Sequence, residues 1–138
     1  MSRLSADELL ELMKTSFPQA RPERIRFESV EPGAVRFRYV ATDDDLRPGD
    51  TVSCPTLMAM SDLGVYLAIL ASIGPVLLSV TTSLNINFLR KPRAGELTVE
   101  AKLLKLGKRL AVGEAYVWSE GVREPVSHAT VTYSIPPD

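Results

Sequence analysis

The sequence is poor in residues that form cross-links or bind metals, because its 138 residues include one cysteine and one histidine. A single cysteine excludes an internal disulfide and fits a reducing compartment. Cys54 and His128 alone also provide no cluster of metal ligands. We therefore expect a protein without a metal site.

An excess of charge of one sign and a long uninterrupted apolar segment are missing as well. Sixteen basic and 17 acidic residues give a net charge of −1, so no overall field attracts nucleic acid or acidic membranes. The N-terminal residues are acidic and polar where a signal peptide needs an apolar core. The longest apolar run, residues 63–78, is interrupted by Gly74-Pro75 and is shorter than the ~20 residues of a membrane span. We expect one cytoplasmic domain over residues 1–138, with neither nucleic acid nor a membrane as partner.

Secondary structure is predicted from capping signals, periodicity and turn residues. Ser5 and Glu8 form a capping box ahead of apolar residues, which predicts a short amphipathic helix over 5–16 and a linker to residue 23. Alternating apolar and polar residues predict strands, and turns rich in glycine separate them. The expected strands are 24–30, 34–40, 76–90, 96–106, 109–118 and 125–135, with a polar loop at 41–50.

The longest expected element is a central helix over residues 55–74. Pro55 suits a first helical turn, and Gly74-Pro75 ends the segment. The stretch is apolar on nearly every side, so we expect it to be buried all round. One long central helix with an antiparallel sheet is an α+β layout.

Asp62 is an unusual carboxylate because it lies in the middle of this apolar helix. Its neighbours three and four positions away include Met58 and Tyr66 and form no solvated face. A charge in such surroundings costs several kcal/mol unless it is paired or used. Two interpretations stay open: Asp62 serves a reaction, or it only bonds a neighbour such as Ser61 or Tyr66.

The start of the helix, near Ser53 and Cys54, is a second candidate feature. A helix N-terminus presents unpaired N–H groups that can stabilise an oxyanion, and Cys54 keeps its N–H whereas Pro55 has none. Asp62 lies eight residues further on, ~12 Å along the axis, so one carbonyl cannot contact both groups of one helix. Two antiparallel helices in a dimer could share such a site, and Gly64 would help them approach closely.

Three stretches carry a resemblance to a known family: RPGDTVSCPTLMAMSDLG, LNINFLRKPRAGE and KLGKRLAVGEAYVW. They resemble the hotdog-fold acyl-CoA thioesterases, in particular the phenylacetate-degradation (PaaI-like) branch, over roughly residues 24–135. The resemblance implies a sheet wrapped around one long helix in a homodimer, or a dimer of dimers (a homotetramer). It also implies hydrolysis of acyl-CoA thioesters without a metal or organic cofactor.

The resemblance assigns roles to three positions. Asp62 matches the catalytic carboxylate, which acts as a general base or a nucleophile. The Cys54 backbone N–H matches the group that polarises the thioester carbonyl. Thr81 matches a hydroxyl that orients the attacking water. The sequence departs from the branch at Arg47, where the branch has Asn, and at Ser53-Cys54-Pro55, where it has His-Gly-Gly.

The departures leave other functions open. A non-catalytic protein that binds acyl-CoA or an aryl ligand is the main alternative. A hydratase or dehydratase would need a histidine paired with the acid, and His128 is placed on a strand face with Val126 and Thr130, where a structural role is expected. The Cys54 thiol could act as a nucleophile, but no histidine stands near it in the sequence to activate it, so we expect it to be a small apolar filler.

Basic residues are concentrated in residues 90–109, which hold seven of the sixteen. Those at two predicted turns could meet the phosphates of coenzyme A, although a solvated turn is the simpler interpretation. Asp43-Asp44-Asp45 lacks the ligand spacing of a metal loop, so we expect it to be solvated. The candidate contacts to substrate or coenzyme A are Arg47, Ser53, Arg90, Lys91, Arg93, Lys108 and Arg109.

Overall fold

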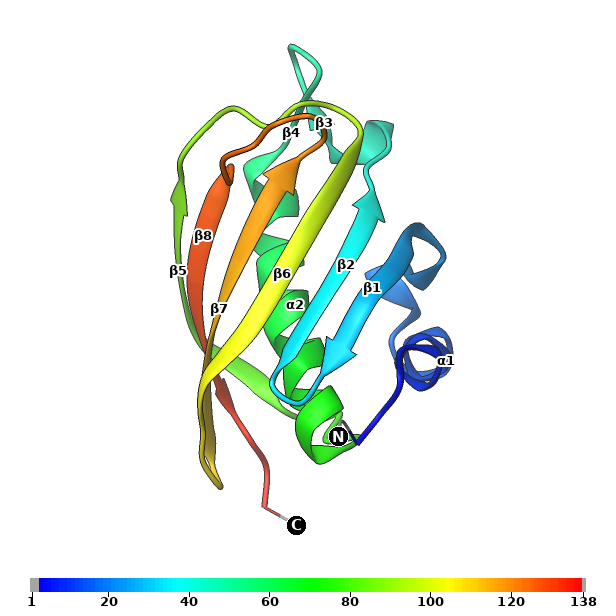
Figure 1. Cartoon of the computed structure of the whole chain (residues 1–138), viewed down its shortest axis with the longest axis vertical. Coiled ribbons are helices and arrows are strands. Elements are labelled where there is room, and N and C mark those ends of the chain that lie inside the picture. Colours follow the sequence, from blue (N-terminus) through cyan, green and yellow to red (C-terminus); the bar gives the residue numbers. More distant parts are fainter. Residues whose placement is uncertain (1–2, 138) are drawn as a thin grey trace.

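The computed structural model describes residues 3–137, which form one antiparallel six-stranded sheet around a long helix (Figure 1). The strand order across the sheet is β1-β2-β6-β7-β8-β5. The expected α+β architecture, a sheet wrapped around a central helix, is therefore confirmed. The strands are β1 Ile25–Glu31, β2 Ala34–Val40, β5 Val80–Phe88, β6 Glu96–Leu106, β7 Leu110–Ser119 and β8 Ser127–Ser134.

The N-terminal helix α1, Ala6–Ser16, forms where the capping box predicts it. The Glu8 N–H donates to Ser5 Oγ at 3.2 Å, and the Ser5 N–H donates to Glu8 Oε1 at 3.0 Å. Leu9 and Met13 are buried on its inner face. Two 3₁₀ turns, η1 Pro18–Ala20 and η2 Pro22–Arg24, then lead to β1 at the side of the sheet opposite β5.

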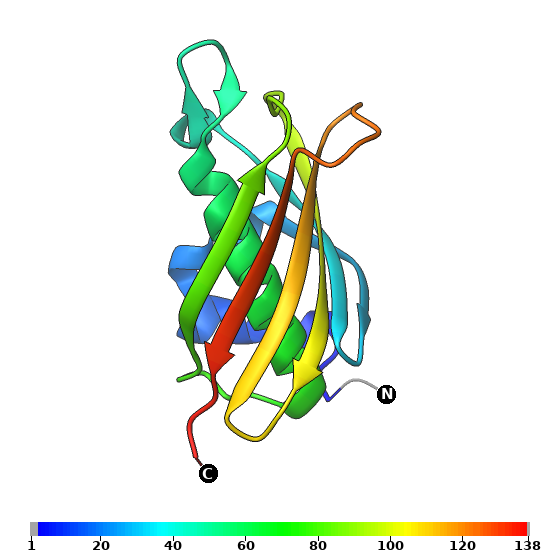
Figure 2. The same ribbon diagram turned by 90° about the vertical axis from the view of Figure 1, so that its left-hand side faces the viewer.

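The central helix α2, Cys54–Ile73, lies across the concave face of the sheet (Figure 2). It is long and apolar enough to span a membrane, but it is mostly buried, as a core helix is. The prediction that it is buried all round is wrong for the single chain. Pro55, Met58 and Ala59 are exposed and Asp62 is half-buried, because residues spaced by three or four positions share the side of the helix that the sheet does not cover.

Two glycines let α2 lie close to the sheet. A Cβ at Gly64 would lie 3.0 Å from Ala101 Cβ and 3.2 Å from Val99 Cγ1, and a Cβ at Gly113 would lie 2.9 Å from Val65 Cγ1. Gly64 therefore faces strand β6 of its own sheet, so the expectation that it serves a contact between two helices is wrong.

The loop at 41–50 is more structured than expected. It contains a 3₁₀ turn, η3 Asp43–Asp45, and a small ribbon of β3 Leu46–Arg47 with β4 Thr51–Val52. Asp43 and Asp44 are exposed as predicted, but Asp45 is only 5% exposed, so the prediction of a solvated loop is wrong for Asp45.

Strand β5 forms one edge of the sheet and is shorter than predicted. It begins at Val80 because residues 74–79 turn back on themselves, with the Ser79 N–H donating to Val76 O at 3.0 Å. Large apolar side chains on and beside β5 are exposed, among them Leu78 at 78%, Val80, Phe88 and Leu89. An edge strand with this much exposed apolar surface is prone to pair with another chain.

Candidate active site

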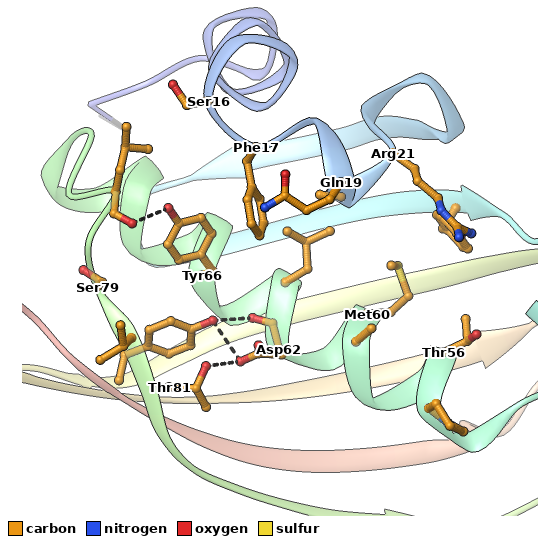
Figure 3. A pocket seen from close by; sticks show the side chains of 18 of the residues that line it. Ser16, Phe17, Gln19, Arg21, Thr56, Met60, Asp62, Tyr66, Ser79 and Thr81 are labelled. Carbon is orange, nitrogen blue, oxygen red and sulfur yellow. Dashed lines mark hydrogen bonds between the residues drawn. The ribbon is translucent and has the colours of Figure 1, made fainter.

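Asp62 is hydrogen-bonded to two side chains from different strands (Figure 3). Thr81 Oγ1, near the start of β5, donates to Asp62 Oδ1 at 2.6 Å. The Tyr133 hydroxyl, near the end of β8, donates to the same oxygen at 2.8 Å and lies 3.2 Å from the Asp62 main-chain oxygen. Among the described residues, none donates to Asp62 Oδ2. The carboxylate is thus fixed through one oxygen and open at the other.

Tyr133 was not found from the sequence. The alternation of its strand places it on the buried face with Ala129 and Val131, but only the strand order shows that this face meets Asp62. Burial, together with the neighbouring Asp62 carboxylate, raises the pKa of Tyr133 above its ordinary value. The phenol therefore keeps its proton at neutral pH and remains a donor.

The two neighbours expected as simple partners of Asp62 bond elsewhere or not at all. The Tyr66 hydroxyl donates to Leu77 O at 3.0 Å. Ser61 Oγ is buried and has no hydrogen-bond partner among the described residues. The sequence also allowed a purely structural Asp62 that bonds Ser61 or Tyr66, and the structure shows neither bond. A purely structural role would now have to come from the bonds to Thr81 and Tyr133.

Asp62 faces a cavity of about 870 Å³ that runs along α2. Phe17 and Gln19 from the N-terminal segment lie across the cavity from α2 (Figure 3). The cavity is apolar near Phe17, Leu63 and Tyr66, and more polar near the start of α2. Its other lining residues include Arg21, Tyr39, Asp45, Ser53, Thr56, Met60, Leu77, Thr81 and Tyr133. A volume of this size is within the range of small-molecule and cofactor sites.

The start of α2 offers an unpaired donor, as the sequence predicts. Ser53 is the N-cap, and its side chain accepts from the Thr56 N–H at 3.3 Å. Cys54 is the first helical residue, and within residues 3–137 its N–H has no acceptor. Ser53 lines the cavity, whereas Cys54 and Arg47 do not.

His128 lies on a different face from Asp62. It is on the outer side of the sheet, where its Nε2 is 2.9 Å from Glu114 Oε1 and its ring contacts that of Tyr116. It therefore pairs with a surface carboxylate, which agrees with the structural role expected for it. Over the described part of the chain, no three His, Cys, Asp or Glu side chains come together to hold a metal ion.

A network of polar side chains surrounds Asp45 beside the start of α2. Asp45 accepts from the Tyr39 hydroxyl at 2.9 Å and from Thr56 Oγ1 at 3.0 Å. Arg21 and Arg24 approach its carboxylate to 3.5 and 3.6 Å. Sequence reasoning missed this network, because its members come from four separate elements.

The structure does not bring the two predicted basic turns together within one chain. Arg90, Lys91 and Arg93 lie between β5 and β6, whereas Lys108 and Arg109 lie between β6 and β7. These turns are at opposite ends of β6 (Figure 1), which puts them about 33 Å apart. Arg90 Nη1 also donates to Pro125 O at 2.6 Å.

Comparison with known proteins finds one family and several similar structures. The sequence model of the thioesterase superfamily matches residues 49–126, which include α2 and the segment that bears Asp62 and Thr81. No curated protein matches the chain at the level of sequence.

Three solved structures illustrate the likeness. A proposed thioesterase from Silicibacter sp. TM1040 is 39% identical, with a TM-score of 0.89 and coverage of 99% of this chain and 95% of that one. A proposed thioesterase from Ralstonia eutropha, a phenylacetic acid degradation-related protein, is 26% identical, with a TM-score of 0.78 and coverage of 92% and 99%. A hypothetical thioesterase with coenzyme A from Streptococcus pneumoniae, 19% identical with a TM-score of 0.74 and coverage of 84% and 88%, shares the fold.

Proposed function

Because the chain belongs to the thioesterase superfamily, of the PaaI-like hotdog type, we propose that it hydrolyses an acyl-CoA or aryl-acyl-CoA thioester to the free acid and coenzyme A. The observation that carries the proposal is Asp62, a carboxylate held by Thr81 and Tyr133 at the wall of a large, mainly apolar cavity. The coenzyme A in the Streptococcus pneumoniae structure supports this class of substrate.

The asymmetric bonding of Asp62 suits it to act as a general base. Thr81 and Tyr133 fix Oδ1, so Oδ2 is the oxygen available to a water molecule. Asp62 accepts a proton from this water as the oxygen attacks the thioester carbonyl. The tetrahedral oxyanion is stabilised by the Cys54 N–H. Collapse of the intermediate breaks the C–S bond, and the proton held by Asp62 returns to the leaving thiolate. Direct attack by the carboxylate is the other possible role of Asp62.

A dimer formed through β5 would complete this site. Asp62 is bonded to the start of β5 through Thr81, whereas the start of α2 lies near the far end of β5, where Thr51 bridges to Arg93. Antiparallel pairing of two β5 edges places the start of one strand beside the end of the other. Asp62 of one subunit would then face the partner subunit's Cys54, as the ~12 Å separation along one helix requires.

The same pairing would unite the two basic turns on one coenzyme A. At one end of the sheet, Leu110 of β7 pairs with Ser134 of β8, which pairs in turn with Val80 at the start of β5. Arg109, next to Leu110, therefore lies level with the start of β5, two strands away. The end of the partner's β5 leads to the partner subunit's Arg90. About three strand spacings, ~14 Å, then separate the turns, in place of about 33 Å within one chain. Lys108 and Arg109 from one subunit, with Arg90, Lys91 and Arg93 from the other, form the proposed phosphate site. Arg47 and Ser53 remain candidate contacts nearer the start of α2.

The experiment is a screen of acyl-CoA substrates in which the released thiol is detected. We expect turnover that Asp62→Asn lowers by at least about 100-fold, because the amide cannot accept the proton. Asp50→Asn, in the exposed turn between β3 and β4, is a matched control that should retain activity. Wild-type rates in folded Asp62→Asn would refute the role of Asp62.

A second candidate function is binding of acyl-CoA or an aryl ligand without hydrolysis. It is favoured by Arg47 and Ser53, which replace the amide and imidazole side chains of the PaaI-like branch. This alternative predicts binding on the order of micromolar affinity without turnover over a broad thioester panel. In either case we propose a cytoplasmic homodimer, or a dimer of dimers, that needs no cofactor.

A further inference from the structure

Asp45 contacts α2 on both sides of the proposed oxyanion donor. Its main-chain oxygen accepts from the Ser53 N–H at 2.7 Å, and its carboxylate accepts from Thr56 Oγ1 at 3.0 Å. Ser53 precedes Cys54 directly, and Thr56 follows it by two residues. One loop residue therefore holds the first turn of α2 through both its backbone and its side chain.

The Asp45 carboxylate is itself held rigidly. Besides Thr56, it accepts from the Tyr39 hydroxyl at 2.9 Å and from the Thr42 N–H at 3.1 Å. Arg21 and Arg24 contribute two positive charges, and Asp44, 3.9 Å from both guanidinium groups, contributes the second negative charge. Because the Asp45 carboxylate at the centre is buried, these bonds favour a single geometry of that side chain, although Arg21 and Asp44 at the edge of the network are exposed. The four charges sum to zero, so the network as a whole is electrically neutral.

We propose that Asp45 is a positioning residue of the thioesterase site, which fixes the first turn of α2 so that the Cys54 N–H points at the reacting carbonyl. The proposal rests on the proposed thioester hydrolysis and deepens it. A misplacement of about 1 Å in a reacting geometry can cost on the order of 100-fold in rate. A donor at a helix end, where the first N–H groups have no partner within the helix, depends on such outside support.

The test compares two variants that disturb the network from opposite ends. Asp45→Asn keeps the shape but removes the charge that holds Arg21 and Arg24. Thr56→Val keeps Asp45 and its ion pairs, and removes the hydroxyl that bonds both Asp45 and Ser53 Oγ. We expect each to lower kcat by about 10-fold or more with KM within about twofold, because ground-state binding is retained. Asp43→Asn, an exposed neighbour outside the cavity, is the control and should match the wild type.

A double-mutant cycle tests whether Asp45 acts through Thr56. If Asp45 acts through Thr56, the double variant should lose little more kcat than the worse single variant, whereas independent effects would multiply. Activities are measured on folded protein well below its unfolding temperature. Wild-type kcat in folded Asp45→Asn and Thr56→Val, or multiplying effects in the double variant, would overturn the proposal.

Amide hydrogen exchange tests the positioning without substrate. We expect exchange at the Thr56 and Leu57 amides, which are bonded to Ser53, to be faster in Asp45→Asn and Thr56→Val than in Asp43→Asn, because the first turn of α2 opens more often. Unchanged exchange would overturn the positioning role. Absence of turnover in the wild-type protein with a positive exchange result would instead refute the proposed hydrolysis and leave the ordering role of Asp45 standing.

Discussion

Both hydroxyl groups that contact Asp62 bond the same carboxylate oxygen. A bond from a neutral hydroxyl to a charged group is worth about 1.5–3 kcal/mol, so two such bonds fix the direction of the whole carboxylate. Thr81 and Tyr133 must themselves be held in place for this to work. They are paired residues on the neighbouring strands β5 and β8, so the sheet fixes both.

Removal of the Tyr133 hydroxyl should therefore impair catalysis more than binding. We expect Tyr133→Phe to lower kcat by about 10-fold with little change in KM, because Asp62 loses one of its two orienting bonds. Steady-state kinetics on acyl-CoA substrates measure this. Tyr116→Phe is the matched control, since Tyr116 lies on the outer face of the sheet beside His128. Equal kcat in the two variants would exclude an orienting role for Tyr133.

Individual residues could be predicted from the sequence only where their type conflicts with their surroundings. Asp62 stands out as a charge in an apolar helix, and the unpaired N–H of Cys54 follows from its place at a helix start. Asp45 and Tyr133 do not stand out, because one lies in a run of three aspartates and the other in an ordinary alternating strand. Their roles depend on which elements, far apart in the sequence, come into contact in the fold, and the residues around each of them do not indicate those contacts.

Elements were predicted more completely, because their signals are local. The capping box of α1, the Pro55 and Gly74 ends of α2 and the turns between β6, β7 and β8 all lie within a few residues of the boundaries they set. The predicted start of β5 was wrong because Val76, Leu77 and Leu78 have the composition of a strand, although the chain turns there to carry β5 to the sheet edge.

The packing of α2 on β6 gives a prediction at the scale of elements. Gly64→Ala should favour the helix intrinsically by about 1 kcal/mol. The new Cβ would nevertheless lie 3.0 Å from Ala101 Cβ, an atom fixed to the backbone, so we expect a net destabilisation of about 1–3 kcal/mol from overpacking. Urea unfolding measures the difference. Ala59→Gly, on the exposed side of α2, is the control, because it changes helix propensity without a change in packing. A Gly64→Ala protein more stable than the wild type would contradict the close packing.

At the scale of the whole molecule, much of the apolar surface left uncovered by the fold belongs to α2 and β5. It comprises the exposed side of α2, with Pro55, Met58 and Ala59, and the apolar side chains on and beside β5, while the β6–β7 hairpin and the end of β2 expose a few more. The other sheet edge, β1, is shielded in part by α1 and carries a bulge between Phe27 and Ser29, a feature that discourages edge pairing. The surface therefore favours association through β5, the geometry that the proposed shared site needs.

Mixing two inactive variants tests the shared site directly. Asp62→Ala removes the base, and Cys54→Pro removes the N–H donor at a helix position that tolerates proline. In a mixed dimer both lesions fall in one site and the other is intact. Random pairing makes half of the dimers mixed, so about a quarter of the wild-type activity should return on subunit exchange. A mixture of Asp62→Ala with Asp62→Asn, whose lesions affect the same half of each site, should stay inactive. If sedimentation and mass spectrometry confirm exchange and no activity returns in the first mixture, Asp62 and the Cys54 N–H do not serve one carbonyl across two subunits.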